Sequence, residues 1–221
     1  MKRLIALDLD GTLEDSRDDM TACARRVRAQ LGLPARDDAA LRPWVNGGMD
    51  QLYAKCFDDF IASGDAAART DAVRNAYEAD YMAHVAVATK LYDGIAPALA
   101  ELHQLGQLAC VTNKPERISR HLLDTLGVGA LFGTVVGGDS CAQAKPHPMM
   151  LSAACERLGF DPRAGHVFMI GDTAADMQLA RSFGATGIWV AWGYVASLEP
   201  PPELQARTPS ELPALIETRA Y

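Results

Sequence analysis

From Leu91 onward, short apolar runs alternate with amphipathic segments of helical periodicity. The runs at 107–113, 133–139, 166–172 and 186–192 have the length and content of buried strands, and helical segments separate them. Another apolar run at 3–9, closed by Gly11, predicts a first strand. Strict alternation of this kind is typical of a parallel sheet with helices on both faces. The sequence therefore predicts an α/β fold with a doubly wound sheet, and a last helix over 210–220.

The stretch between the first strand and this alternating region has a different pattern. Residues 16–31 predict a helix that ends at LGLP, and residues 38–84 predict two more helices without a strand between them. We therefore expect a Rossmann-like core domain over 1–15 and 85–221, with a helical domain over 16–84 inserted after the first strand.

The chain has 221 residues, a formal net charge of −7 and a pI near 5.2. This charge argues against broad binding to nucleic acid or to an anionic membrane, so an anionic substrate needs a local cation. Five widely spaced cysteines without a CxxC pair predict reduced core thiols. The first apolar run is too short for a signal peptide, and no apolar stretch approaches the ~20 residues of a membrane span. We expect a cytoplasmic protein.

Polar residues follow each of the first four predicted strands. In a parallel sheet the carboxyl ends of the strands form the ligand-binding edge, so these residues are expected to converge there. Each alone has an ordinary explanation as a helix cap, a turn or a solvated charge, but their joint placement does not. They are Asp8 and Asp10; Thr112, Asn113 and Lys114; Lys145; and Asp172 and Asp176.

Crowded carboxylates at one edge predict a hard cation. Asp8, Asp10 and Asp172 offer oxygen ligands of the kind that Mg²⁺ prefers, and Mg²⁺ also accepts phosphate oxygens. Thr112 and Asn113 precede a helix whose N–H groups favour phosphate, and Lys145 adds a positive charge. A calcium loop of the EF-hand type is excluded, because its D-x-D-x-D-G order is missing and a strand precedes the motif.

Four motifs resemble those of the haloacid dehalogenase-like hydrolase superfamily, in the same order and at similar gaps. They are DLDGTLEDS, VTNKP, KPHP and GDTAAD, and the inserted helices are similar to that family's small cap. Within the superfamily, LYDGIAPAL, VVGGD, AKPHP and VAWGY are most similar to the phosphoglycolate phosphatase branch.

The resemblance implies a role for each motif residue. Asp8 is the expected nucleophile, and Asp10 the expected acid and base, with its backbone carbonyl among the metal ligands. Thr112 and Asn113 are expected to hold the phosphoryl oxygens, and Lys145 to orient Asp8. Asp172 would complete the Mg²⁺ site, with Asp176 behind it or bound through water. Because a halide leaves without a proton, an acid at Asp10 favours phosphate esters over alkyl halides.

Some positions stay open or depart from the family pattern. Glu14 stands where an apolar residue is common, and Ala174 and Ala175 where polar residues are common. The cap is expected to close over the site and exclude water. In the cap, Gly47 and Gly48 either approach the substrate or form a plain turn, and Trp44 either stacks on substrate or packs in the cap core.

The leading hypothesis is a Mg²⁺-dependent phosphomonoester hydrolase for a small phosphorylated metabolite, with 2-phosphoglycolate as the best single substrate. The alternatives are a phosphosugar mutase, a nucleotide or pyrophosphate phosphatase, and a binding protein without activity. Phosphonate hydrolysis would need a cap lysine, for which Lys55 is the candidate, but the surrounding chain does not resemble that branch. The protein is expected to be a monomer or a dimer.

Overall fold

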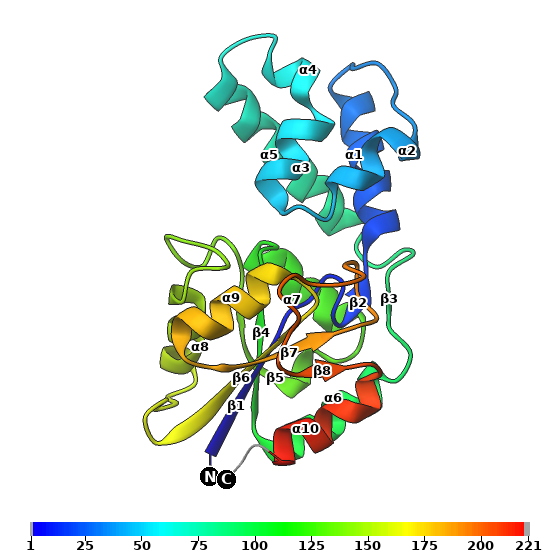
Figure 1. Ribbon diagram of the computed structural model, residues 1–221. Helices are drawn as coiled ribbons and strands as arrows, with labels where there is room; N and C mark the ends of the chain where they lie inside the picture. The colour runs from blue at the N-terminus through cyan, green and yellow to red at the C-terminus, as the bar shows by residue number, and fades with distance from the viewer. Residues whose placement is uncertain (1, 219–221) are drawn as a thin grey trace. The chain divides into compact units, whose positions relative to one another are not determined.

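The structure is a computed structural model that describes residues 2–218 (Figure 1). Internal contacts divide the chain into two compact units. The core unit comprises Met1–Asp15 and Leu91–Tyr221, and the helical unit comprises Ser16–Lys90. The sequence places the return to the core domain at residue 85, a few residues before Leu91. The domain boundaries expected from the sequence stay a prediction.

A six-stranded parallel sheet forms the centre of the core unit. Its spatial order is β5-β4-β1-β6-β7-β8, and every neighbouring pair is parallel. The strands are β1 (Lys2–Leu7), β4 (Gln107–Val111), β5 (Phe132–Val136), β6 (Gly165–Gly171), β7 (Thr186–Val190) and β8 (Gln205–Ala206). The chain builds one half of the sheet from β1 to β5 and then crosses to the other side of β1. The predicted α/β fold class is confirmed, and β8, which was not predicted, adds an edge strand.

Helices cover both faces of the sheet, as the continuous apolar strands require. Figure 1 shows α8 and α9 on one side of the sheet, and α6 with α10 on the other. Side chains along β1 alternate between these two layers: Leu4 and Ala6 belong to the cluster beneath α8, so Ile5 points to the opposite face. The helices are α6 (Ile95–Leu105), α7 (Glu116–Thr125), α8 (Met149–Arg157), α9 (Ala174–Phe183) and α10 (Leu212–Thr218), with 3₁₀ turns η2 (Gly129–Leu131) and η3 (Pro209–Glu211).

The last helix begins at Leu212, after the η3 turn. The helix predicted over 210–220 is therefore present but shorter at its start, and its last two residues lie outside the described part of the chain.

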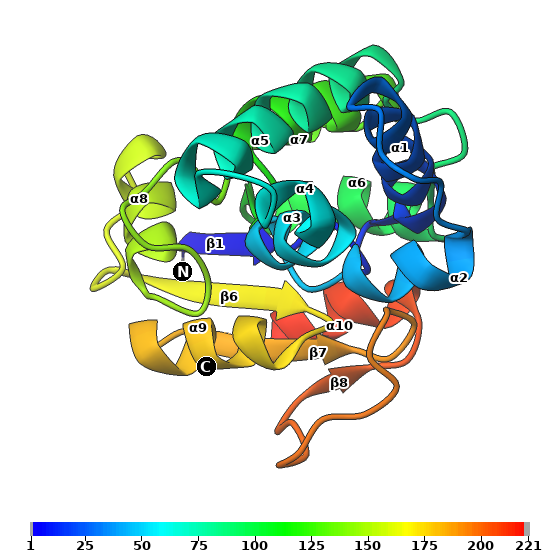
Figure 2. The ribbon, with the colours of Figure 1, turned by 90° about the horizontal axis from the view of Figure 1, so that it is seen from above.

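The helical unit packs around a buried tyrosine cluster. Its α1 helix packs against α5 (Figure 2), and the ring of Tyr77 lies 5.8 Å from that of Tyr53 and 6.1 Å from that of Tyr81. Arg28, also buried, donates to the carbonyls of Pro34 and Cys56 and to the Asp59 carboxylate, so its charge is fully paired. The elements are α1 (Arg17–Gln30), α2 (Asp38–Leu41), η1 (Arg42–Trp44), α3 (Met49–Cys56), α4 (Asp58–Ile61) and α5 (Ala66–Ala83).

Two short strands, β2 (Glu14–Asp15) and β3 (Lys90–Leu91), form a separate small sheet that the sequence did not predict. Cys23, Cys56, Cys110 and Cys155 are buried, as expected of core thiols, whereas Cys141 is half-buried. Among the described residues, we find no helix whose length and apolarity would let it cross a bilayer.

Candidate active site

Three neighbouring strands bring the motif residues to one edge of the sheet. Asp8 follows the end of β1, Thr112 follows β4 and Asp172 follows β6. Because β4 and β6 flank β1, these positions are adjacent. Asp176 lies in the first turn of α9, and Lys145 comes from the loop between β5 and α8. The structure thus brings residues from four chain segments together.

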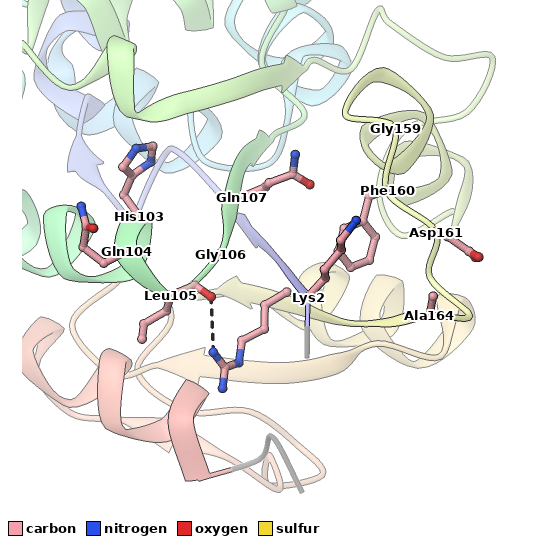
Figure 3. Close-up of a pocket in the computed structure, with 11 residues that line it drawn as sticks. Lys2, His103, Gln104, Leu105, Gly106, Gln107, Gly159, Phe160, Asp161 and Ala164 are labelled. Atoms are coloured by element: carbon pink, nitrogen blue, oxygen red, sulfur yellow. Dashed lines mark hydrogen bonds between the residues drawn. The ribbon is translucent and has the colours of Figure 1, made fainter.

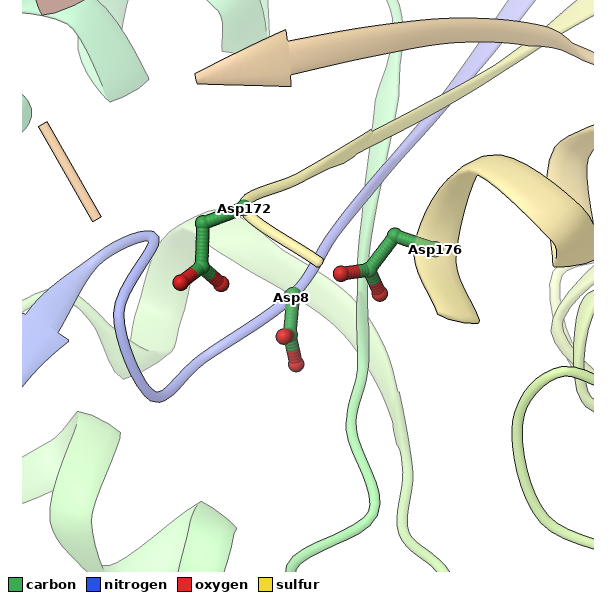
Figure 4. Close-up of side chains that lie close together, drawn as sticks. All are labelled: Asp8, Asp172 and Asp176. Atoms are coloured by element: carbon green, nitrogen blue, oxygen red, sulfur yellow. The ribbon is translucent and has the colours of Figure 1, made fainter. Parts of the chain in front are cut away.

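The carboxylates of Asp8, Asp172 and Asp176 form one buried group (Figure 4). One oxygen from each lies within 4.8 Å of the others, and no side chain of the three is more than 7% exposed. Burial raises the pKa of Asp8 well above its usual range, and it raises the pKa of Asp172 to about 6. Burial thus disfavours the ionised forms of Asp8 and Asp172, and a cation bound beside them would stabilise those forms.

Lys145 supplies one such positive charge. Its Nζ lies 2.6 Å from Asp8 Oδ1 and 2.8 Å from Asp176 Oδ1. Burial lowers the pKa of this lysine, but the nearby Asp176 and Asp8 carboxylates outweigh that effect and raise it above the usual value. One ammonium against three carboxylates leaves the group with an excess of negative charge when all three are ionised.

Asp172 is held by contacts from both sides of the sheet edge. Thr12 Oγ1 donates to its Oδ1 at 3.3 Å, and the Tyr194 backbone N–H donates to its Oδ2 at 2.8 Å. A Cβ on Gly193 would lie 2.2 Å from the Asp172 Cβ, and one on Gly11, where φ is +81°, would lie 2.5 Å from Oδ2. Both positions require glycine, since Asp172 passes between two backbone segments.

Asp176 has a second function as a helix cap. Its Oδ2 accepts hydrogen bonds from the Thr173 N–H at 3.0 Å and from the Thr173 hydroxyl at 2.5 Å. The Asp176 N–H in turn donates to Thr173 Oγ1 at 3.4 Å, so the two residues form a capping box at the start of α9. Its other oxygen binds Lys145. The T-x-x-D spacing in the sequence is the signal for this cap.

Asn113 braces the loop that carries Lys145. Its side-chain oxygen accepts from the Lys145 N–H at 2.9 Å, and its side-chain nitrogen donates to the Lys145 carbonyl at 3.4 Å. The hydroxyl of Thr112 accepts from the Lys114 N–H at 3.2 Å. The expected phosphate-binding role of Thr112 and Asn113 stays a prediction, and the bracing by Asn113 is an addition that only the structure reveals.

Lys114 is a site residue for which the sequence predicted no role. Its ammonium group forms an ion pair with Asp10, and its side chain is almost fully buried. A lysine after a strand carries no signal by itself, because the most frequent place for lysine is the solvated surface. The Asp10 carboxylate is not part of the group of three acids. Asp8, Asp10 and Asp172 remain the predicted metal ligands, with Asp10 contributing its backbone carbonyl.

The three buried acids fit a hard divalent cation. They provide only carboxylate oxygens, which suit Mg²⁺ or Ca²⁺ rather than a softer metal. A bound cation would offset their excess negative charge and would lower the raised pKa values of Asp8 and Asp172.

A pocket of about 700 Å³ lies elsewhere, at the edge where the strands begin (Figure 3). Lys2 and Arg3 of β1, Gln107 of β4 and Phe160 are among the residues that line it. None of the motif residues lines this pocket, so it is not the candidate active site despite its volume.

Comparisons with known proteins agree with this geometry. Residues 2–184 match the haloacid dehalogenase-like hydrolase family. The chain is 35% identical over 212 residues to a phosphoglycolate phosphatase of Xanthomonas campestris pv. campestris, covering 96% of this chain and 93% of the relative. It is 33% identical over 200 residues to an N-acetylmuramic acid 6-phosphate phosphatase of Pseudomonas aeruginosa, covering 88% and 86%.

The fold is also found among solved structures. A predicted phosphoglycolate phosphatase from Haemophilus somnus has a TM-score of 0.82 at 24% identity and covers 97% of each chain. The chain belongs to the haloacid dehalogenase-like hydrolase family, which confirms the resemblance drawn from the motifs. It is accordingly an enzyme, a hydrolase of the phosphatase type.

Proposed function

We propose that the protein is a Mg²⁺-dependent phosphomonoester hydrolase that acts on a small phosphorylated metabolite through an aspartyl-phosphate on Asp8. One observation carries the proposal: Asp8 lies at the end of the central strand, buried, with Lys145 Nζ 2.6 Å away, inside a group of three carboxylates. A carboxylate that is paired with a lysine and lies beside a metal site can be kept ionised, as a nucleophile requires.

In the first step, one carboxylate oxygen of Asp8 attacks phosphorus. The bond from phosphorus to the ester oxygen breaks, and the carboxyl group of Asp10 gives its proton to the departing alkoxide. Lys145 offsets charge at Asp8, and the Thr112 hydroxyl with the Asn113 backbone N–H would bind the phosphoryl oxygens. With this arrangement the protein acts mainly by positioning and by charge stabilisation.

In the second step, water attacks the phosphorus of the aspartyl-phosphate. The Asp10 carboxylate takes a proton from that water, the bond from phosphorus to Asp8 breaks, and inorganic phosphate leaves. Asp8 is restored as a carboxylate, and Asp10 is again protonated for the next cycle.

Asp8 and Asp172, with the Asp10 backbone carbonyl, are the residues that would hold Mg²⁺. Asp176 would act behind them, since both of its oxygens already accept hydrogen bonds from Lys145 and Thr173. When bound, the ion supplies positive charge to the phosphoryl oxygens and cancels repulsion among the acids.

For the substrate, 2-phosphoglycolate is the first candidate, because curated phosphoglycolate phosphatases match nearly the whole chain. A phosphosugar such as N-acetylmuramic acid 6-phosphate is the second candidate, and the Pseudomonas aeruginosa relative supports it. Both are phosphate monoesters of an alcohol, for which an acid at Asp10 is suited.

Phosphate release across a panel of phosphorylated metabolites, with and without Mg²⁺, tests the proposal. Asp8→Asn should lower turnover by about 10⁴-fold or more while the fold is retained, because the nucleophile is lost. Asp124→Asn, a similar change at an exposed aspartate of α7, should leave turnover unchanged. Full activity of Asp8→Asn would refute the assignment of the nucleophile, and interconversion of isomers without net phosphate release would favour a mutase.

A further inference from the structure

The two aspartates of the DLD motif are each paired with a lysine of their own. Lys145 binds Asp8, and Lys114 binds Asp10 through Oδ1. The side chain of Lys114 is 3% exposed, whereas that of Asp10 is 22% exposed. The ammonium group is therefore buried behind a carboxylate that still reaches solvent.

The backbone around Lys114 is fixed by two loops of the sheet edge. Its N–H donates to Thr112 Oγ1 at 3.2 Å, and its carbonyl accepts from the Gly138 N–H, beyond β5, at 3.1 Å. The two loops pack so closely that a Cβ on Gly138 would lie 2.5 Å from the Asn113 carbonyl oxygen. These contacts fix the backbone from which the Lys114 side chain reaches Asp10, and the burial of that side chain restricts its motion.

This arrangement separates Asp10 from the other acids. Asp8, Asp172 and Asp176 gather in one group, and the carboxylate of Asp10 is not part of it. A carboxyl group that gives a proton to a leaving alcohol has to be held outside the metal site and in one orientation, because a displacement of about 1 Å can cost about 10²-fold in rate.

We propose that Lys114 is a positioning residue that orients the Asp10 carboxyl group for proton transfer. The contact between the Lys114 ammonium group and Oδ1 holds the Asp10 carboxyl group in the orientation in which it gives a proton to the ester oxygen and later takes one from the attacking water. The inference rests on the proposed function, since it assigns a helper to the acid and base of that reaction.

The test compares two esters that differ in their need for a proton. In 2-phosphoglycolate, or whichever alkyl phosphate the panel identifies, the alkoxide has to be protonated. In p-nitrophenyl phosphate, the phenolate leaves readily without a proton. General acid catalysis contributes about 10² to 10⁴-fold. Lys114→Met should therefore lower kcat for the alkyl ester by about 10²-fold, with KM little changed.

The same variant should keep the pre-steady-state burst of nitrophenolate within about fivefold of the wild-type rate, because the burst reports only the first step. Lys114→Arg, which keeps a cation, should recover part of the loss on the alkyl ester. Lys2→Met serves as the matched control, because it removes an exposed lysine at the far end of β1. It should change neither kcat for the alkyl ester nor the burst rate with p-nitrophenyl phosphate.

Equal losses on both esters, or a KM raised for both, would overturn the proposal and assign Lys114 to phosphate binding. Unchanged kcat on the alkyl ester would overturn it as well. If Lys114→Met does not fold, Lys114→Gln repeats the comparison, since it keeps a hydrogen-bond donor and removes the charge. Absence of both a burst and turnover in the wild-type enzyme would instead refute the proposed function itself.

Discussion

Replacing Gly193 by alanine should disturb the candidate metal site without changing any acid. The added Cβ would lie 2.2 Å from the Asp172 Cβ, 2.5 Å from the Gly11 carbonyl oxygen and 2.6 Å from Asp172 Oδ2. Real Cβ contacts are not shorter than about 3.0 Å. Two of the three neighbours belong to a buried aspartate and the third to the backbone, so rotation of an exposed side chain cannot relieve the overlap.

Gly193 is half-buried, but the Asp172 side chain that the new methyl group would overlap is fully buried. Overpacking of a close-packed site of this kind typically costs about 1–3 kcal/mol. For a chain of this length each kcal/mol lowers Tm by about 2–4 °C, so we expect a fall of about 2–12 °C. The shift of Asp172, which also accepts from the Tyr194 N–H, should weaken Mg²⁺ binding by about 10 to 100-fold.

Thermal unfolding at increasing Mg²⁺ concentration measures both effects together, because a ligand that binds the folded state raises Tm according to its affinity. Gly64→Ala is the matched control: its Cβ would meet only the flexible Arg69 side chain, at 3.1 Å, and it lies in the helical unit. A Gly193→Ala variant with the wild-type Tm and the wild-type dependence on Mg²⁺ would refute the reasoning.

Two further predictions concern the helical unit and the metal. The Arg28 guanidinium hydrogen-bonds Asp59 and lowers the pKa of that carboxyl to about 2. Because the folded-state pKa lies below the unfolded value of about 3.9, the stabilisation is complete above pH ~4 and is lost as pH falls towards 2. Asp59 is about one-third exposed, so screening reduces the effect, and Asp59→Asn should lower the free energy of unfolding by about 1 kcal/mol at pH 7. The deficit should shrink between pH 4 and pH 2 in urea unfolding, and a deficit independent of pH would contradict the ion pair as its cause. Replacing Mg²⁺ by Ca²⁺ should inhibit phosphate release, because a larger and looser coordination shell misplaces the phosphoryl group; equal rates with both ions would count against this geometry.

The sheet could be predicted because its strands carry a strong signal. Each long strand is a continuous apolar run between helices, and that pattern fixes both the parallel pairing and the edge where polar residues meet. The strands β2, β3 and β8 span two residues each, too few for any periodicity, so they were missed. Their pairing depends on tertiary neighbours and not on local sequence.

The side chains of the site were identified as a group, but their contacts were not. The convergence of Asp8, Lys145 and Asp172 follows from strand order, whereas the partner of a given charge depends on distances of an ångström or less. Nothing in TNKP indicates that the Asn113 amide binds the backbone of Lys145, or that Lys114 turns towards Asp10 and not towards solvent.

The double role of Asp176 links local folding to the chemistry of the site. One of its oxygens anchors the first turn of α9, and the other meets Lys145 inside the acidic group. The ordered start of this helix and the correct arrangement of the charges are consequently a single cooperative event. Any motion that frays that first turn also releases the lysine from one of its two anchors, so a mutation at Asp176 loosens a helix and the neighbourhood of Asp8 at once.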